Sequence, residues 1–267
     1  MEIENRNVIP KIIHYCWFGK KRKPKLVRDC IKSWKKYLPD YEIIQWNEKN
    51  SDLSHPFVKE AYRLEKWAFV SDYIRLKVLY EYGGIYLDTD MMLLKSLNDF
   101  LDNECFFGAE QNDIVSCGII GSIKYNGFIE KCLISYNRVN FNNEIVWNDF
   151  IITLKITNIL RNEFNFYKDF DQFIQLKNIS IYPVNVFYPF PFKYKKDILN
   201  YKEYIQKESY AVHLWVGSWI VYNEFKFLRA GEYRKGFTIM YEKGISKNLN
   251  FKYFRKILSA LKESLKK

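Results

Sequence analysis

The stretch Ser71-Asp72-Tyr73-Ile74-Arg75, followed by Gly83-Gly84-Ile85-Tyr86-Leu87-Asp88-Thr89-Asp90, decides how the chain is interpreted. It places Asp88 and Asp90 one residue apart, where a short apolar and β-favouring run ends. Carboxylate oxygens are ligands that Mg²⁺ and Mn²⁺ prefer, and proteins commonly hold these cations with one or two carboxylates plus the phosphates of a substrate. Ligands of open α/β sheets bind beyond the carboxyl ends of strands. The pattern therefore predicts a divalent-cation site, although Asp-x-Asp is also frequent in ordinary turns.

One long helix, from Phe57 to Tyr82, is predicted directly before this strand. Its apolar residues recur at three- and four-residue spacing, and Gly83-Gly84 supplies a C-terminal stop. Asp72 and Arg75 lie three positions apart, so their side chains share one face of the helix. The spacing alone is also typical of a simple surface ion pair.

The remaining patterns predict an α/β fold. A strand at Val8 to Phe18, a helix at Pro24 to Tyr37 and a strand at Tyr41 to Trp46 precede the long helix. This alternation favours a mainly parallel, doubly wound sheet. Beyond residue 100 we expect strands at Cys105 to Ala109, Ile114 to Gly121 and Tyr210 to Trp215, helices at Gly127 to Tyr136 and Ile145 to Asn162, and an irregular extended stretch at Ile179 to Phe192.

Composition limits the class of protein. A chain of 267 residues can form one large α/β domain. It contains no apolar run near the roughly 20 residues that span a bilayer, and its first residues lack the basic and apolar regions of a signal peptide. We therefore expect a cytoplasmic protein. Five cysteines without a Cys-x-x-Cys pair argue against a disulfide framework or a zinc cluster.

The formal net charge of +11 indicates an anionic partner. Basic residues cluster at Lys20 to Lys25 and in the tail from Phe251 to Lys267. The tail has helical periodicity with apolar residues on one face, so it can lie on an anionic membrane surface or pack that face on the domain. The sequence leaves both open. No nucleic-acid-binding motif is present, which argues against nucleic acid as the partner.

Three blocks together carry a resemblance to a known family. They are Ile9-Pro10-Lys11-Ile12-Ile13-His14-Tyr15-Cys16-Trp17-Phe18-Gly19, the stretch from Ser71 to Asp90 quoted above, and His213 with Gly217-Ser218-Trp219. They resemble the DXD-motif glycosyltransferases of family 32, which include capsular-polysaccharide sugar transferases and α-mannosyltransferases. The clostridial glucosylating toxins are distantly similar. The resemblance covers about residues 8 to 125 and returns near 210 to 220.

The resemblance implies a GT-A fold, in which helices flank a mixed central sheet, with a C-terminal helical extension. A single catalytic domain would cover residues 1–245, with a nucleotide-sugar half at about 1–125 and an acceptor half at about 126–245. Residues 246–267 would form the basic amphipathic helix. The implied enzyme is a retaining hexosyltransferase that uses Mn²⁺ or Mg²⁺ and a UDP-sugar. Its acceptor would be a saccharide, lipid-linked, in bacterial capsular polysaccharide synthesis. The basic tail would place the enzyme at the inner face of the cell membrane.

The resemblance also implies roles for single residues. Asp90 would bind the metal directly, with Asp88 and His213 as further ligands. Asp88 would also contact the donor, and Asp72 and Arg75 would hydrogen-bond its sugar. Trp17 would stack on the nucleotide base, and Tyr86 is either a core residue or a donor contact. Ser218 and Trp219 would close over the diphosphate.

Catalysis in such a site would be electrostatic, carried by the metal, Asp88, Asp90 and Arg75. Retaining glycosidases use a second carboxylate as a nucleophile, and no such candidate stands out here, so a front-face substitution is expected. The segment Ile145 to Thr153 departs from the family's usual Gly-Pro-rich signature, and no acceptor residue is assigned. Two alternatives remain. A metal-dependent phosphohydrolase would carry Thr or Val where Met92 stands. The other is a noncatalytic carbohydrate- or membrane-binding module.

Overall fold

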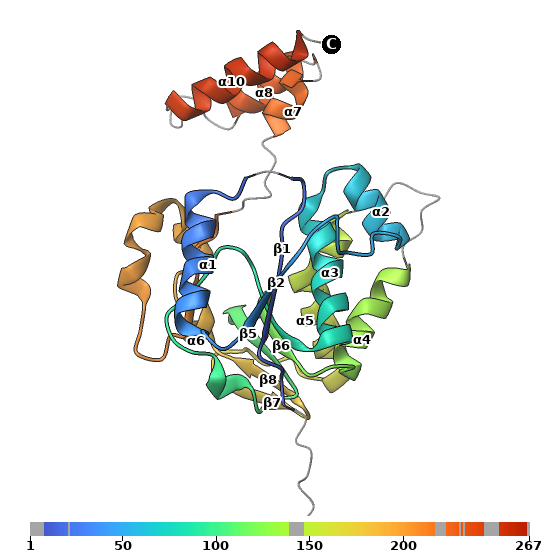
Figure 1. The fold of residues 1–267 in the computed structure, drawn as a ribbon, viewed down its shortest axis with the longest axis vertical. Coiled ribbons are helices and arrows are strands. Elements are labelled where there is room, and N and C mark those ends of the chain that lie inside the picture. Colours follow the sequence, from blue (N-terminus) through green and yellow to red (C-terminus); the bar gives the residue numbers. More distant parts are fainter. Residues whose placement is uncertain are drawn as a thin grey trace, which may run out of the picture. The chain divides into compact units, whose positions relative to one another are not determined.

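A seven-stranded mixed sheet forms the centre of the protein, in the order β2-β1-β3-β6-β5-β8-β7 (Figure 1). The computed structural model describes residues 8–20, 22–138, 147–216, 223–229, 231, 233–242 and 251–265. The first three strands are β1 (Ile12–Cys16), β2 (Glu42–Trp46) and β3 (Gly84–Leu87), and both neighbours of β1 run parallel to it. This half has the βαβ topology that the alternating pattern predicts.

The other half of the sheet breaks the parallel arrangement. β6 (Ile114–Ser122) pairs antiparallel with β3 and with β5 (Cys105–Gln111). β8 (Ile179–Tyr182) runs parallel to β5 and antiparallel to β7 (Ile174–Leu176). The expectation of a mainly parallel sheet is therefore wrong, because a tight hairpin joins β5 and β6. The helix-flanked mixed sheet that the GT-A fold requires is confirmed.

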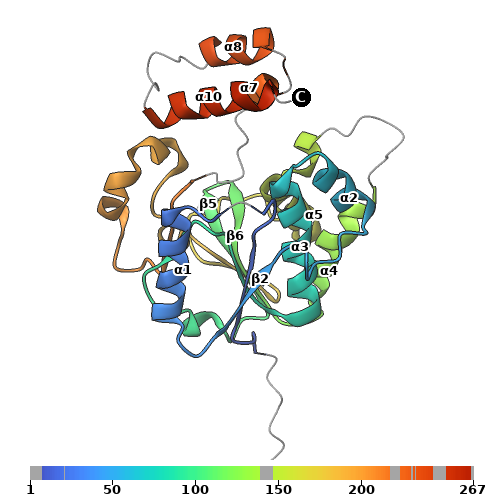
Figure 2. The same cartoon turned by 45° about the horizontal axis from the view of Figure 1, so that its top comes forward.

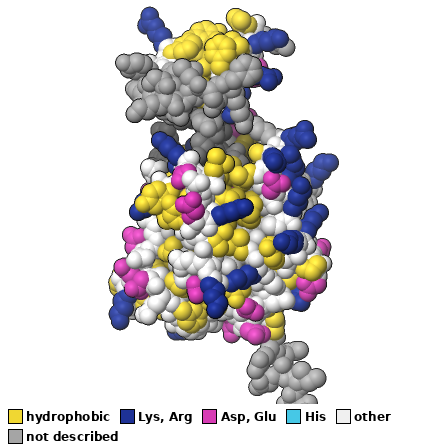
Figure 3. Space-filling view, turned by 90° about the vertical axis from the view of Figure 1, so that its left-hand side faces the viewer, with side chains coloured by type: hydrophobic (Ala, Val, Ile, Leu, Met, Phe, Trp, Pro, Cys, Tyr) yellow, Lys and Arg dark blue, Asp and Glu magenta, His cyan; other side chains and the backbone are white. Residues whose placement is uncertain are grey.

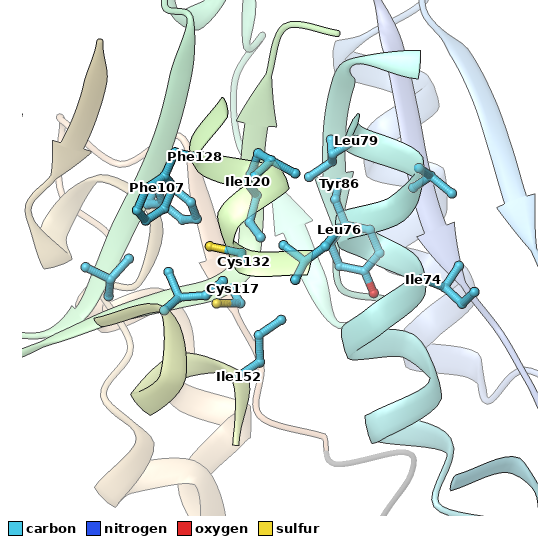
Figure 4. Packing of buried hydrophobic residues seen from close by; sticks show 14 of the residues in the cluster. Ile74, Leu76, Leu79, Tyr86, Phe107, Cys117, Ile120, Phe128, Cys132 and Ile152 are labelled. Carbon is cyan, nitrogen blue, oxygen red and sulfur yellow. The ribbon is translucent and has the colours of Figure 1, made fainter. Parts of the chain in front are cut away.

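Helices cover both faces of the sheet and create two cores (Figure 2). One face carries α3 (Trp67–Tyr82), α4 (Gly127–Ile134) and α5 (Ile152–Phe164); the other carries α1 (Lys25–Tyr37) and α6 (Val184–Phe187). Leu76 and Leu79 of α3 face Ile120 of β6 and Cys132 of α4 (Figure 4). On the opposite face Trp34 of α1 is fully buried. All five cysteines are buried and free.

The predicted helix from Phe57 to Tyr82 is two helices, α2 (Pro56–Arg63) and α3. Glu65 has a left-handed φ of 54°, and the Lys66 N–H reaches back to the Ala61 carbonyl. This is the hydrogen-bond pattern of a Schellman C-cap, which usually has glycine at the left-handed position. Glutamate at this position gives no sequence signal for a helix end. The apolar residues keep helical spacing across the break, so the sequence predicted one continuous helix.

Two other predicted elements differ from the structure. The helix expected at Ile145 to Asn162 begins at Ile152 as α5, after a short turn η3 (Trp147–Phe150), and residues 139–146 lie outside the described residues. The stretch expected to be irregular at Ile179 to Phe192 contains β8, α6 and the start of η4 (Phe192–Tyr204). Pro183 and Pro191 stand directly before α6 and η4, where proline is compatible with a helix start.

Residues 217–267 form a second compact unit, separate from the unit at 1–216. Its helices are α7 (Asn223–Arg229), α8 (Tyr233–Glu242) and α10 (Phe251–Ser264). Phe225, Leu228, Met240 and Ala260 form its core. The sequence assigned α7 and α8 to a domain ending near residue 245, but they group with α10. None of the described helices is both long and apolar enough to cross a membrane.

Candidate metal and donor site

Two strands far apart in the sequence bring Asp88, Asp90 and His213 together. Asp88 follows β3 directly, and its N–H donates to the Gly118 carbonyl of β6 at 2.7 Å. After Asp90 the chain forms β4 (Met91–Leu93), which pairs antiparallel with β9 (Ala211–His213), so Met91 lies opposite His213. The Leu214 N–H then donates to the Asp90 carbonyl at 3.0 Å. The backbone pairing therefore fixes the spacing of the three side chains.

The two carboxylates and the imidazole can share one ion. One ligand atom from each of Asp88, Asp90 and His213 lies within 4.8 Å of the others, and among the described residues this is the only such cluster of His, Cys, Asp and Glu. His213 Nε2 lies 3.0 Å from Asp90 Oδ1, and the Val216 N–H donates to Asp90 Oδ2 at 2.9 Å. Hard carboxylate oxygens with one imidazole nitrogen fit Mn²⁺ or Mg²⁺. The predicted ligand set is therefore assembled in one place.

Asp90 and His213 each favour the charged form of the other. Burial alone raises the pKa of Asp90, but His213 and the Val216 N–H hold that pKa below its usual value. Burial lowers the pKa of the His213 imidazole, but Asp90 outweighs it and the net shift is upward. His213 Nδ1 is buried and has no hydrogen-bond partner among the described residues. The Nε2 edge of the ring is thus the one directed at the carboxylate.

Arg75 is buried and links α3 to Asp88 and to the Cys117 carbonyl of β6. Its Nη2 lies 2.9 Å from Asp72 Oδ1 and 3.2 Å from Asp88 Oδ1, and its Nη1 donates to the Cys117 carbonyl at 2.6 Å. Burial raises the pKa of Asp72 to about 7, although Arg75 opposes the shift. The pair is thus no surface ion pair. The guanidinium contacts Asp72, Asp88 and the Cys117 carbonyl of the same chain, and it orients Asp88. The predicted contacts of Asp72 and Arg75 with a sugar stay predictions.

Tyr86 takes the core position of the two roles considered for it. Its side chain is buried, and Arg75 lies 4.5 Å from the centre of its ring. The hydroxyl donates to Asp88 Oδ1 at 3.0 Å and lies 2.9 Å from Ser71 Oγ. Tyr86 therefore helps to hold the Asp88 carboxylate in place. Its contact with a donor stays a prediction.

The structure describes only one of the other three predicted donor contacts, which are Trp17, Ser218 and Trp219. Trp17 follows β1 and is half-buried, with Lys23 Nζ 5.7 Å from its ring centre. This position at the end of a parallel strand is compatible with stacking on a base, which stays a prediction. Ser218 and Trp219 lie outside the described residues.

One carboxylate near the cluster was missed in the sequence. Glu110, at the end of β5, accepts a hydrogen bond from Ser116 Oγ at 2.9 Å. Burial raises the pKa of Glu110, Asp88 adds to the rise, and Ser116 and His213 oppose it. Glu110 therefore lies close enough to Asp88 and His213 to interact with them electrostatically. No sequence signal distinguishes it, because Glu110 stands alone in a β-hairpin.

Comparison with known proteins agrees with this geometry. Residues 24–107 match the family described as glycosyltransferase sugar-binding region containing DXD motif. Asp72, Arg75, Asp88 and Asp90 lie inside this segment.

Several individual relatives are named as glycosyltransferases. A human alpha-1,4-N-acetylglucosaminyltransferase is 28% identical over 190 residues, covering 68% of this chain and 50% of that protein. An uncharacterized glycosyltransferase of Acanthamoeba polyphaga mimivirus is 35% identical over 128 residues, covering 43% of this chain and 50% of that protein. The chain thus spans about half the length of these two relatives. The solved PaToxG glycosyltransferase is 19% identical, with a TM-score of 0.47 over 59% of this chain and 70% of that one.

Proposed function

We propose that the protein is a metal-dependent, retaining glycosyltransferase that moves a hexose from a UDP-sugar to a saccharide hydroxyl. The observation that carries this proposal is the joining of Asp88, Asp90 and His213 to the buried Arg75–Asp72 pair. The match of residues 24–107 to the DXD sugar-binding region supports the same conclusion.

Each group of the site has a role in this chemistry. A divalent cation held by Asp88, Asp90 and His213 would supply positive charge against a departing diphosphate. Asp90 is held on its far oxygen by the Val216 N–H, and Asp88 by Tyr86 and Arg75, so both carboxylates are oriented before a substrate binds. Such preorganised charge costs no reorganisation during the reaction. The guanidinium of Arg75 lies 3.2 Å from Asp88 Oδ1 and so places a positive charge against this carboxylate.

The substrates are the finer part of the proposal. UDP-galactose, UDP-glucose and their N-acetylated forms are the donors to test first, with a lipid-linked saccharide of bacterial capsular polysaccharide synthesis as the acceptor. The test is to incubate the purified protein with a panel of UDP- and GDP-sugars plus Mn²⁺ and to follow nucleotide release and the anomeric configuration of the product. Release from one UDP-sugar with retention supports the proposal. Inversion contradicts the retaining part.

The panel also separates the two alternative functions. Release of inorganic phosphate from phosphomonoesters, without nucleotide-sugar turnover, would identify a phosphohydrolase. Absence of any turnover together with binding to saccharides would identify a noncatalytic module.

We further propose that the C-terminal unit binds the anionic inner face of the cell membrane, near a lipid-linked acceptor. Residues 217–267 contain twelve Lys and Arg against four Asp and Glu, so eight of the eleven net positive charges belong to this unit. The donor site in the other unit therefore does not account for most of the charge. An anionic lipid surface attracts such clusters.

Different residues of α10 correspond to the two possibilities considered for the tail. Ile257, Ala260 and Leu261 pack within the unit, whereas Phe254 and Leu258 are 50% and 51% exposed. Leu265 is also exposed, and the three exposed positions share one face at helical spacing. Hydrophobic side chains gather on this unit with Lys and Arg beside them (Figure 3). Exposed phenylalanine and leucine favour lipid over nucleic acid, because a phosphate backbone requires only the charge.

Vesicle flotation tests this surface directly. We expect the full chain to float with vesicles that contain phosphatidylglycerol. It should not float with vesicles of neutral phosphatidylcholine alone. A chain ending at Asn250 should lose this binding. Equal flotation of both chains contradicts the role of α10, and tighter binding to RNA than to vesicles would replace lipid with nucleic acid.

A further inference from the structure

The β5–β6 hairpin is irregular where it approaches Asp88. Its pairing changes register between Phe107 and Gly108 and again between Ala109 and Gln111. The second irregularity leaves Glu110 without a paired residue on β6. Bulges of this kind occur next to active sites, where they redirect a side chain. Glu110 is thus the residue of β5 that the hairpin geometry singles out.

The first irregularity, between Phe107 and Gly108, also affects residues that contact the candidate site. It leaves Cys117 to Ile119 unpaired with β5, and the carbonyls of Cys117 and Gly118 bind Arg75 and the Asp88 N–H. A Cβ on Gly118 would lie 3.1 Å from the Tyr188 hydroxyl and 3.3 Å from Asp88 Oδ2. Both are closer than an ordinary contact, so glycine suits the place where the chain passes between these two groups. The unpaired segment Cys117 to Ile119 therefore contacts Arg75 and Asp88 directly.

Glu110 has one occupied and one available oxygen. Oε2 accepts from Ser116 Oγ, which is itself buried, whereas no described residue donates to Oε1. Neither oxygen is among the enclosed polar atoms that lack a partner. The side chain is therefore anchored at one oxygen and can accept a hydrogen bond at the other.

We infer that Glu110 binds a hydroxyl of a reacting sugar through Oε1, beside the cation site. This inference rests on the proposed glycosyltransferase function and adds a substrate contact to the same site. Carboxylates suit this task because they accept strong hydrogen bonds from hydroxyl groups, typically at about 2.5–2.7 Å. The hydroxyl belongs either to the acceptor or to the transferred hexose, and the two sources give different kinetics.

The test compares Glu110→Gln with Glu104→Gln, a matched change at an exposed glutamate directly before β5. The amide oxygen that replaces Oε2 in Glu110→Gln can still accept from Ser116, so the fold should be retained. We expect transfer by the Glu110 variant to fall by about 100-fold, since a lost charged contact to a substrate hydroxyl has effects of this order. Ser116→Ala, which frees the carboxylate from its anchor, should give a smaller loss.

Two readouts identify the source of the hydroxyl. If it belongs to the acceptor, slow hydrolysis of the UDP-sugar is unchanged and the acceptor KM rises. If it belongs to the donor, hydrolysis falls with transfer and UDP-sugar binding weakens, while binding of UDP itself does not change.

The inference is overturned if Glu110→Gln transfers and hydrolyses within about threefold of the wild type, a difference too small for a lost charged contact. A covalent sugar ester on Glu110, found by mass spectrometry, would also overturn it, because the residue would then be a nucleophile. Failure of the proposed function looks different, since the wild type itself would then turn over no nucleotide sugar.

Discussion

The candidate site and the C-terminal unit differ in how their charges are balanced. At the site, Arg75 is 5% exposed and lies between Asp72 and Asp88, so each buried charge faces an opposite one at close range. In residues 217–267 most charges are positive and have too few acidic residues to balance them. Among its described residues, Arg229 and Glu263 form an exposed pair. Paired charges in fixed positions can orient a substrate for a reaction. Exposed charges without partners of opposite sign can attract an anionic surface.

This difference changes how the net charge of +11 is interpreted. The unit that holds the candidate site is close to electrically balanced, so the proposed binding of a nucleotide would depend on local geometry and on a cation. The basic residues of 217–267 lie in a different unit from Asp72, Arg75, Asp88 and Asp90. Mutations in the two regions should therefore have separable effects, on stability and catalysis in one and on surface binding in the other.

The largest effect is expected from Arg75→Leu. Removing the guanidinium leaves Asp72 and Asp88 without their counter-charge, which should lower the free energy of unfolding by about 3–5 kcal/mol. Urea denaturation measures this. The matched control is Arg63→Leu, which breaks an exposed pair with Glu60 and should cause no measurable change. Equal effects of the two variants would contradict the contrast between buried and exposed charge.

A pH-dependent effect should come from buried His14. Burial lowers its pKa from the usual 6.5 to about 4, while its ring lies between the Trp46 Nε1 donor and the Gly83 carbonyl. The unfolded chain therefore binds more protons than the folded chain between these two pKa values. Stability should be full above the unfolded pKa of 6.5 and fall by about 3 kcal/mol as the pH drops to about 4.

Denaturation midpoints between about pH 4 and pH 7 measure this contribution. His14→Gln removes the titrating group, so its stability should vary less over the same range, with a lower value at neutral pH. An unchanged pH profile in the variant would show that other groups dominate.

A smaller effect is expected on membrane binding from the paired change Phe254→Asp and Leu258→Asp. Loss of two apolar contacts should weaken binding to anionic vesicles by about 30-fold, or about 2 kcal/mol. The matched control is Ile134→Asp in the other unit, because Ile134 is exposed to the same extent as Leu258, at 51%. Co-sedimentation at several lipid concentrations measures the difference. Equal losses in both proteins would show that the exposed face of α10 is not the contact.

The smallest effect is expected from one basic residue of the same helix. Lys262→Gln should weaken binding to anionic vesicles by about fivefold, because a basic group near such a surface contributes about 1 kcal/mol. The effect should shrink with added salt and be absent with neutral vesicles. Lys168→Gln, an exposed lysine of the other unit, is the control and should have no effect.

Local sequence patterns predicted the elements that carry Asp88 and Asp90 of the candidate cation site. The helix stop, the strand and the two aspartates follow one another without a break from Gly83 to Asp90. The sequence alone therefore predicts that Asp88 and Asp90 lie directly after the strand. Gly84 in particular has a φ of 102°, and a Cβ there would lie 2.7 Å from the Ile12 carbonyl. The partnership with His213 was expected only from the family resemblance, and the β4–β9 pairing confirms that the residues meet.

Long-range and irregular features escaped prediction for physical reasons. The antiparallel insertion of β6 between β3 and β5 is a matter of strand pairing, which local periodicity does not encode. Glu110 depends on a bulge, which a hairpin sequence does not reveal. Arg75 and Asp72 had the spacing of a surface pair, and only the packing of α3 against the sheet buries them.

The central claim is that Asp88, Asp90 and His213 hold a cation that binds the diphosphate of a nucleotide. The most direct measurement is the thermal unfolding midpoint of the full chain with UDP, with and without Mn²⁺, for the wild type and for Asp90→Ala. We predict that UDP raises the midpoint of the wild type only when Mn²⁺ is present, and that Asp90→Ala abolishes this rise. A rise that does not require Mn²⁺, or that survives in Asp90→Ala, would contradict the claim.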